Sequence, residues 1–489
     1  MNFRQFGIVI FSFLFSNCFI FYPFVADRFE KESNAEEYAL AALYFLSDKE
    51  HPTPGNNGIL EKINPGNATF TLSWNLGLDD KTESSNLGYR VYVSSSNNIQ
   101  TVADMEANGE ALTNLTNSLS NLEITSLRIR GSVSYYNVLI QDSFSKKSAY
   151  SSISATIVPK YLYILNQTDN SISSFSIDKN TGVLTSITTL VGGNSPSSLY
   201  IPPRGNFVYM ASTGENRIRL YSQDPTTGNL TFVNSYTGGN GVLSLLSDQE
   251  GRYLYAADSS SNQISMYTMN TTDGSLTPLA VSSIATENFP IHLSIDPSGS
   301  FLFALNRDSD TVSQFVLNYT TGDLTPLVIP TQVTGVKPFQ TAVDPLGLYA
   351  FAVNSVGNSL SNFKIDPIRG EWKRYATLNT AVGAGPSSIL FHPSGSYFYI
   401  AESTDNQIRQ MSFDRTNGIL QSLPTPTLSQ TGTPSYIVTD QGGKFLYCLN
   451  KTGNTVSLYT IATDGSLSFN ANYPTGNSPV YGVIYSTVE

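Results

Sequence analysis

The chain of 489 residues contains only two cysteines and three histidines. The cysteines, Cys18 and Cys448, cannot supply a disulfide framework, and Cys448 is expected to pack as a small apolar side chain. Three histidines cannot build a His-rich metal centre, so neither a metal ion nor a cofactor is predicted. Charged residues are 13% of the chain and the formal net charge is −11. Because phosphate binding requires a basic surface, nucleic acid is not an expected partner.

The chain beyond residue 160 also lacks the apolar spacing of helices, and its apolar residues alternate with a period of two. Turn residues recur there in three series, each with a step in the forties. A fixed step of this length is typical of propeller blades. The first series is Gly182, Gly228, Gly274, Gly322, Gly370, Gly418 and Gly465; the second is Asn170, Asn216, Asn262, Asp310, Asn358, Asn406 and Asn454; the third is Gly205, Gly251, Gly299, Gly347, Gly395 and Gly443.

One repeat predicts four short antiparallel strands. A tight turn at a third-series glycine precedes an aromatic run such as Tyr253-Leu-Tyr255, and an Asn/Asp turn leads to an alternating strand such as Ile264-Ser-Met-Tyr267. Seven such sheets packed radially bury their faces and hide most edges. The first repeat lacks an opening strand, and the chain ends with a spare one, roughly 480–485. We therefore predict that this last strand completes the first blade, pairs with residues near Tyr163 and closes the ring.

Residues 64–158 carry alternating runs without the blade repeat, including Thr69–Trp74, Gly88–Val93 and Tyr135–Gln141. The early Trp and the Tyr-x-Val-Tyr strand resemble a fibronectin type III sandwich, and Trp74 is expected in its core. The predicted fold class is therefore all-β, a seven-bladed β-propeller preceded by an immunoglobulin-like sandwich. The expected divisions are a leader at 1–30, a short helix and linker at 31–63, the sandwich at 64–158 and the propeller at 159–489.

The leader combines Arg4 with an apolar run from Phe6 to Phe15, a pattern typical of an export signal. Leu14-Phe-Ser-Asn-Cys18 resembles a relaxed bacterial lipobox, which implies cleavage before Cys18 and lipidation of its sulfur. Apolar character continues to Val25, so an uncleaved membrane anchor is a second interpretation and an ordinary signal peptide a third. Each interpretation places the folded part in the cell envelope, outside the cytoplasm.

The segment from Pro297 to Asn306 and the recurrent Thr-Gly-x-Leu motif resemble sequences of the lactonase family of seven-bladed propellers. This family includes 6-phosphogluconolactonases and carboxymuconate cyclases. The resemblance covers residues 160–489. The resemblance implies the fold more specifically than an activity, because related binding propellers share the same blade motifs.

Enzymatic members of that family carry a polar cluster of His, an Arg-His pair, Glu and Arg around the channel. In the best register Glu402 occupies the Glu position and Lys451 the last Arg position, but Ser387 and Ser388 replace the Arg-His pair. A different register places His292 at the His position. No register retains the whole set. Glu402, Lys451 and His292 are thus the candidate catalytic residues if the protein is an enzyme, since lactone hydrolysis needs a proton-transfer group and a cation.

Two functions follow as expectations. The first is a membrane-anchored lipoprotein whose propeller binds a protein or a small carbohydrate-like ligand over one face. The second is an active lactonase acting on a sugar lactone. A convergent Glu, Lys and His at the channel mouth would favour the enzyme, and a ring of uncharged polar side chains would not. Asp308 and Asp310 form the only acidic pair that merits examination as an ion site.

Overall fold

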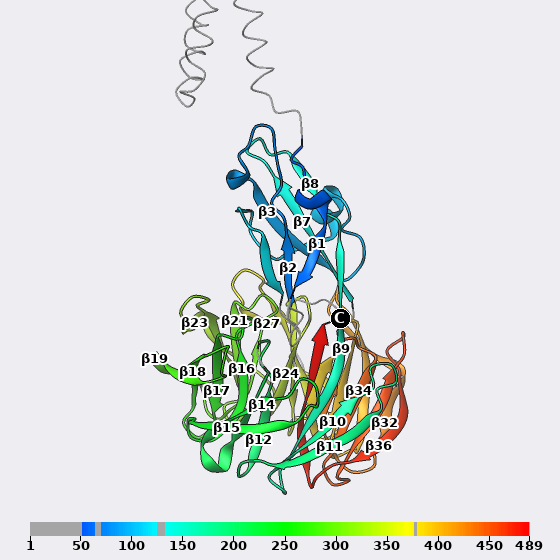
Figure 1. The fold of residues 1–489 in the computed structure, drawn as a ribbon. Helices are drawn as coiled ribbons and strands as arrows, with labels where there is room; N and C mark the ends of the chain where they lie inside the picture. The colour runs from blue at the N-terminus through cyan, green and yellow to red at the C-terminus, as the bar shows by residue number, and fades with distance from the viewer. Residues whose placement is uncertain (1–50, 64–69, 125–132, 205, 376–378, 489) are drawn as a thin grey trace, which may run out of the picture.

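The computed structural model describes residues 51–63, 70–124, 133–204, 206–375 and 379–488. The predictions for the leader, Cys18 included, and for the short helix after it concern residues outside these ranges. The described chain forms an elongated N-terminal part mounted on one side of a broad ring of sheets (Figure 1). Its only α-helix is α4 (Val102–Asn108). No helix in the described ranges is long and apolar enough to cross a bilayer.

The N-terminal part consists of two antiparallel sheets around one core. Trp74 and Leu72 of one sheet pack in this core with Tyr89 and Val91 of the other, and the indole is buried as expected. The resemblance to a fibronectin type III domain stays a prediction. The first sheet contains β1 (Leu60–Ile63), β2 (Phe70–Trp74) and β6 (Asn121–Ile124); the second is built on β3 (Gly88–Ser94) and β7 (Val133–Gln141), with β4 (Glu110–Ala111), β5 (Thr116–Asn117) and β8 (Lys147–Ala149) at its edges.

Seven sheets form the propeller, which confirms the predicted all-β, seven-bladed part of the fold class. In each blade the first strand is innermost, and it contacts the first strands of both neighbouring blades around the ring. Blade 1 is β37 (Pro479–Val488), β9 (Ile153–Asn166), β10 (Ser171–Ile177) and β11 (Leu184–Val191); blade 2 is β12 (Pro196–Tyr200), β13 (Phe207–Ser212), β14 (Arg217–Gln223) and β15 (Leu230–Thr237); blade 3 is β16 (Val242–Ser247), β17 (Tyr253–Asp258), β18 (Gln263–Met269) and β19 (Leu276–Ala285).

The remaining blades follow the same order, and only blade 5 has a divided outer strand. Blade 4 is β20 (Pro290–Ile295), β21 (Phe301–Asn306), β22 (Thr311–Leu317) and β23 (Leu324–Val333); blade 5 is β24 (Pro338–Val343), β25 (Tyr349–Asn354), β26 (Ser359–Ile365), β27 (Trp372–Arg374) and β28 (Thr380–Ala381); blade 6 is β29 (Pro386–Phe391), β30 (Tyr397–Glu402), β31 (Gln407–Asp414) and β32 (Ile419–Ser429); blade 7 is β33 (Pro434–Thr439), β34 (Phe445–Asn450), β35 (Thr455–Ile461) and β36 (Leu467–Pro474).

The C-terminal strand closes the ring as predicted. In β37, Val483 lies opposite Tyr163 and Ile484 opposite Leu162 of β9. The start of β9 also pairs with β7 of the N-terminal part, from Ile153 to Thr156. One continuous strand therefore belongs to both parts, and the expected division between residues 158 and 159 falls inside it. The first sheet begins at Leu60, before the expected start at residue 64.

The second-series residues connect neighbouring blades. All seven have positive φ, between 48° and 55°, which is the left-handed conformation expected of Asn/Asp turns. Each side-chain Oδ1 accepts a hydrogen bond from the backbone N–H that directly precedes the inner strand of the next blade. The acceptor–donor pairs are Asn170–Ser195, Asn216–Gly241, Asn262–Phe289, Asp310–Lys337, Asn358–Gly385, Asn406–Thr433 and Asn454–Ser478, at 2.8–2.9 Å.

In the part of the chain that the structure describes, six of the seven first-series glycines, all except Gly370, accept a hydrogen bond from a tyrosine hydroxyl of another blade. The Tyr163 hydroxyl donates to the Gly228 carbonyl at 2.9 Å, and the Tyr447 hydroxyl donates to Gly182 at 2.8 Å across the closure of the ring. All seven of these glycines have positive φ, as their turns require. In blade 5 the corresponding aromatic residue is Phe351, and the hydroxyl of Tyr375 donates to the Gly418 carbonyl instead.

These turns define two faces of the ring. β9 enters the propeller from the N-terminal part and is the second strand of blade 1, so the turns between first and second strands face the N-terminal part. We call this side the proximal face. The opposite side, which carries the turns between second and third strands and the starts of the inner strands, is the distal face (Figure 1).

Candidate functional site

The last residues of the seven second strands form a buried polar ring near the distal face. Each is fully buried, and each ends its strand directly before the second-series turn. The Asn450 side-chain amide donates to Thr455 Oγ1 and Ser457 Oγ, five and seven residues later, at 3.1 and 2.7 Å. Three other blades repeat this arrangement. The seven positions are Asn166, Ser212, Asp258, Asn306, Asn354, Glu402 and Asn450.

Glu402 is the blade 6 member of this ring, and both of its carboxylate oxygens are already bound. Arg409 Nε donates to Oε1 at 2.5 Å and the Gly383 N–H donates to the same oxygen at 2.6 Å. Gln407 Nε2 donates to Oε2 at 2.6 Å. Gln407 and Arg409 lie five and seven residues after Glu402, so they occupy the positions of the hydroxyl partners in the asparagine blades. Glu402 and Arg409 thus replace an Asn–Ser pair of the repeat by an ion pair.

His292 is the third residue of the inner strand β20. Its Nδ1 lies 3.1 Å from Thr341 Oγ1, and that hydroxyl donates to Ser294 Oγ at 3.1 Å. Since the Thr341 proton is directed to Ser294, the contact requires His292 to donate from Nδ1. Burial lowers the pKa of His292 to about 4, so its ring is neutral at pH 7.

Lys451 is exposed on the distal face, in the turn between the second and third strands of blade 7. Within the described residues, no hydrogen bond or ion pair joins any two of Glu402, Lys451 and His292. Ser387 and Ser388 also have structural partners: Ser387 Oγ donates to the Pro434 carbonyl at 3.0 Å and Ser388 Oγ accepts from the Ile437 N–H at 3.2 Å. The three candidate residues are therefore not assembled into one constellation.

Two tyrosines and a glutamine stand on inner strands at the same strand position as His292, and the sequence analysis did not predict them as site residues. Tyr436 and Tyr481 lie with ring centroids 4.4 Å apart on adjacent inner strands. Burial raises the pKa of Tyr436 well above its ordinary value, while the Gln340 side chain opposes that shift. Their spacing is the signal that could have found them, because each follows the proline that begins its inner strand by two residues.

In the acidic pair of blade 4, cationic side chains of the protein bind Asp308 and a backbone N–H binds Asp310. Arg307 Nε and Lys337 Nζ donate to Asp308 Oδ1 at 2.9 and 3.1 Å, and these contacts lower the pKa of Asp308. Asp310 accepts from the Lys337 N–H through its second-series contact. In the described part of the chain, no group of three or more His, Cys, Asp or Glu side chains could hold a metal ion.

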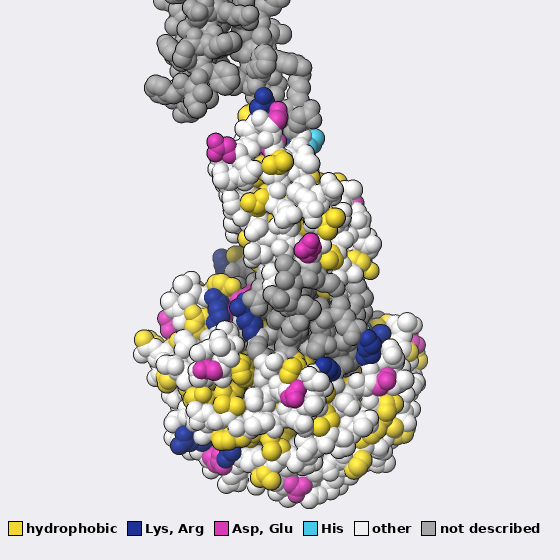
Figure 2. Space-filling view, in the orientation of Figure 1, with side chains coloured by type: hydrophobic (Ala, Val, Ile, Leu, Met, Phe, Trp, Pro, Cys, Tyr) yellow, Lys and Arg dark blue, Asp and Glu magenta, His cyan; other side chains and the backbone are white. Residues whose placement is uncertain are grey.

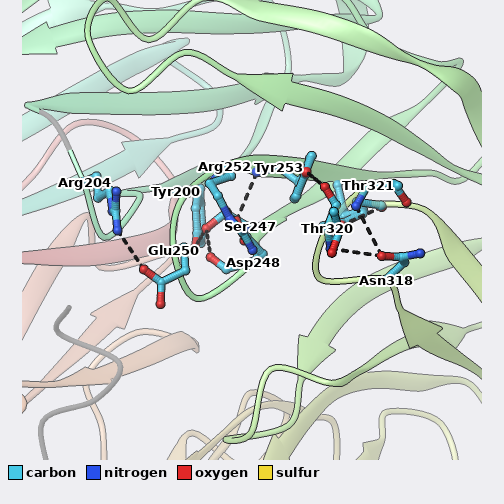
Figure 3. A network of polar contacts seen from close by, with 12 residues as sticks. Tyr200, Arg204, Ser247, Asp248, Glu250, Arg252, Tyr253, Asn318, Thr320 and Thr321 are labelled. Carbon is cyan, nitrogen blue, oxygen red and sulfur yellow. Dashed lines mark hydrogen bonds and ion pairs between the residues drawn. The ribbon is translucent and has the colours of Figure 1, made fainter. Parts of the chain in front are cut away.

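A polar network on the proximal face connects blade 3 with its neighbours (Figure 3). Arg204 of blade 2 forms an ion pair with Glu250 at 2.7 Å. Arg252 pairs with Asp248 at 3.0 Å, and its guanidinium lies 3.8 Å from the ring of Tyr319 in blade 4. These contacts connect turns of consecutive blades, so the network stabilises the ring.

The fold is a seven-bladed propeller, and within the described residues its candidate residues Glu402, Lys451 and His292 are not in contact with one another. The model of the family described as lactonase, 7-bladed beta-propeller, matches residues 112–245, 234–337 and 328–480. These overlapping matches extend over more than half of the chain, so the chain belongs to this family. No curated protein matches the chain.

Solved structures agree on the fold. One similar structure is a putative 6-phosphogluconolactonase from Bacteroides fragilis, 19% identical, with a TM-score of 0.59 over 67% of this chain and 98% of that chain. Another is the periplasmic gluconolactonase PpgL from Pseudomonas aeruginosa, 17% identical, with a TM-score of 0.59 over 68% of this chain and 99% of that chain. A third, from Lactobacillus plantarum, is 17% identical with a TM-score of 0.59 over 67% and 99% of the two chains.

Proposed function

We propose that this chain is an exported, membrane-anchored member of the lactonase family whose propeller binds a ligand or a protein and does not hydrolyse lactones. The observation that carries the proposal is the environment of Glu402. A general base or acid must have an oxygen available to the substrate. Both oxygens of Glu402 accept hydrogen bonds within its own blade or from the adjoining connection, and the carboxylate is fully buried.

The other two candidates do not supply the missing chemistry. The neutral imidazole of His292, with a pKa of about 4, is a weak base and is not a cation at pH 7. Lys451 is exposed on blade 7, while His292 lies on the inner strand of blade 4. Stabilising a developing carboxylate would need a cation available beside the proton-transfer group, and the Arg409 guanidinium beside Glu402 already donates to that carboxylate.

The channel supports binding of a neutral or carbohydrate-like ligand. Tyr436 and Tyr481 provide two adjacent, tilted aromatic rings, and Gln340 and His292 carry polar atoms at the same level of the inner strands. Aromatic rings with a few polar groups are the usual lining of small-molecule sites. This surface favours recognition by stacking and hydrogen bonding over ionic recognition.

The test is hydrolysis of glucono-δ-lactone and 6-phosphogluconolactone by the purified protein. The proposal predicts no turnover above the spontaneous rate. Turnover that disappears in Glu402→Gln, with the variant still folded, would replace the binding proposal by the enzymatic one.

Active lactonase is the second candidate, and His292 is the observation that favours it. The family places a histidine at an inner strand, and two similar structures carry gluconolactonase names. If this candidate is correct, His292→Ala lowers turnover by more than tenfold. Ser294→Ala, which removes the hydroxyl that accepts from Thr341, lowers it much less.

Export through the leader is part of the proposal. Its support is the cation at Arg4, the apolar run from Phe6 and the lipobox-like sequence ending at Cys18. Metabolic labelling with a fatty acid tests it, since lipidation predicts incorporation that is abolished in Cys18→Ser. Membrane association without incorporation would favour the uncleaved anchor.

A further inference from the structure

The end of the N-terminal part that lies away from the propeller exposes a group of apolar side chains. The start of β7 pairs with β9 next to the propeller, so the other end of β7, at Gln141, lies farthest from it. Gly88 of β3 pairs with Gln141, and β2 ends on the same side at Trp74. Among the described side chains of residues 51–155, the exposed large apolar ones are Ile59, Leu76, Leu78, Leu115 and Phe144, all in or beside the segments at this end. Figure 2 shows hydrophobic side chains at the surface of the N-terminal part.

Hydrogen bonds hold two of these segments in place. The Gly77 N–H donates to the buried Tyr89 hydroxyl at 2.8 Å, between Leu76 and Leu78. The Asp142 carboxylate accepts from the N–H groups of Phe144 and Lys146 at 2.8 Å. Leu78, 69% exposed, and Phe144, 48% exposed, are thus displayed on turns that hydrogen bonds hold in place.

The two turns are also joined to each other and to the start of the described chain. Thr82 Oγ1 and Ser143 Oγ lie 2.8 Å apart, which connects the segment after Leu78 to the turn of Phe144. Thr53 pairs with Leu78, and His51 Nδ1 lies 2.9 Å from the Lys147 carbonyl. The chain therefore arrives from the leader at the same end that displays the apolar side chains.

We infer that this end, which we call the apolar tip, rests in the surface layer of a lipid bilayer. The inference relies on the proposed membrane anchor. The apolar run of residues 6–25 and the apolar tip are separated by about 25 residues of chain, so an anchored protein holds the tip close to the membrane. Exposed Leu and Phe side chains gain by entering the boundary between headgroups and acyl chains.

The charges at the apolar tip give no preference for anionic lipid over neutral lipid. Lys81 lies 3.8 Å from Asp80, and Lys147 is paired with Glu106. Because these cations have acidic neighbours, attraction to anionic headgroups contributes little. Contact should therefore persist in phosphatidylcholine and at high salt. In such an arrangement the distal face of the propeller, with the channel mouth, points away from the membrane (Figure 1).

The experiment uses the full chain carrying Phe144→Trp, reconstituted in phosphatidylcholine vesicles with and without brominated acyl chains. Flotation first establishes that the chain is on the vesicles. We expect brominated lipid to quench the added tryptophan and its emission to shift to the blue. The control is Val328→Trp, on the exposed outer strand of blade 4, which should not be quenched. Trp74 and Trp372 are buried and common to both variants.

A second variant separates insertion from simple tethering. Adding Leu78→Ser to Phe144→Trp should reduce the quenching several-fold while the chain still floats. If the chain floats but the tryptophan at residue 144 is quenched no more than the one at residue 328, this inference is overturned and the anchor stands. A blue shift without quenching means that protein covers the apolar tip, and it also overturns the inference. A chain that does not float overturns the anchor and this inference with it.

Discussion

Asn358 Oδ1 accepts a hydrogen bond from the Gly385 N–H at 2.9 Å, which connects the turn of blade 5 to the start of the inner strand of blade 6. The same contact occurs at all seven junctions of the ring, including Asn454 to Ser478 at the closure. A side chain that appeared to serve only its own turn therefore also sets the position of the next blade.

Substitutions at Asn358 separate these two roles. Alanine loses the acceptor and disfavours the positive φ of 48°, so we expect a loss of about 2 kcal/mol in the free energy of unfolding. Glycine permits the conformation and loses only the acceptor, so the expected cost is about 1 kcal/mol. Urea denaturation measures both. Equal losses for the two variants would contradict the role of the left-handed conformation.

Ring closure by β37 predicts a strong effect at Tyr485. This side chain is 2% exposed and packs 5.8 Å from the Tyr161 ring. Tyr485→Ala should cost about 3 kcal/mol because it leaves a cavity between the last strand and the first blade. Phe469→Ala is the matched control, because Phe469 is 57% exposed on the outer strand β36. Similar thermal stabilities for the two variants would argue against the closure.

Asp258 predicts a pH-dependent stability. It occupies the position of the asparagines in blades 1, 4, 5 and 7, and burial raises its pKa from 3.8 to about 6. Because the folded-state pKa is raised, protonation of Asp258 stabilises the fold. This contribution is complete below about pH 4 and is lost as the pH rises through 6. Asp258→Asn should therefore stabilise the protein by about 1–3 kcal/mol at pH 7.5 and by much less at pH 4.

The measurement is the urea midpoint of wild type and Asp258→Asn at both pH values. Asn450→Asp provides the reverse control in blade 7, where the asparagine donates to Thr455 and Ser457. It should destabilise the protein at pH 7.5. A gain for Asp258→Asn that is the same at both pH values would show that ionisation of Asp258 is not the cause.

Turn residues made the propeller predictable from sequence, because each blade repeats the same backbone requirements. Gly182 and Asn170 mark positions where few other residues tolerate a positive φ, so their recurrence reveals the number of blades. The last strand, near Val483, could then pair only with the free inner edge of the first blade. These features depend on local conformation, which a sequence records directly.

The continuity of β9 could not be predicted in the same way. Alternation of apolar residues indicates a strand but not its neighbours, and β9 changes partners from β7 to β37 within one run. The pairing of Glu402 with Arg409 was missed for a different reason. A comparison with catalytic residues of relatives does not reveal this contact, whereas the repeat predicts it, because Asn450 of blade 7 bonds Ser457 seven residues later.

The double-mutant cycle of Glu402→Gln and Arg409→Met tests most directly whether Glu402 is a structural partner of Arg409. Each single change leaves a buried polar group without its partner, whereas the double change removes both ends of the pair. The structure predicts a coupling energy of about 2 kcal/mol or more in the free energy of unfolding. A coupling energy near zero would mean that the carboxylate is not committed to Arg409 and would leave it available for catalysis.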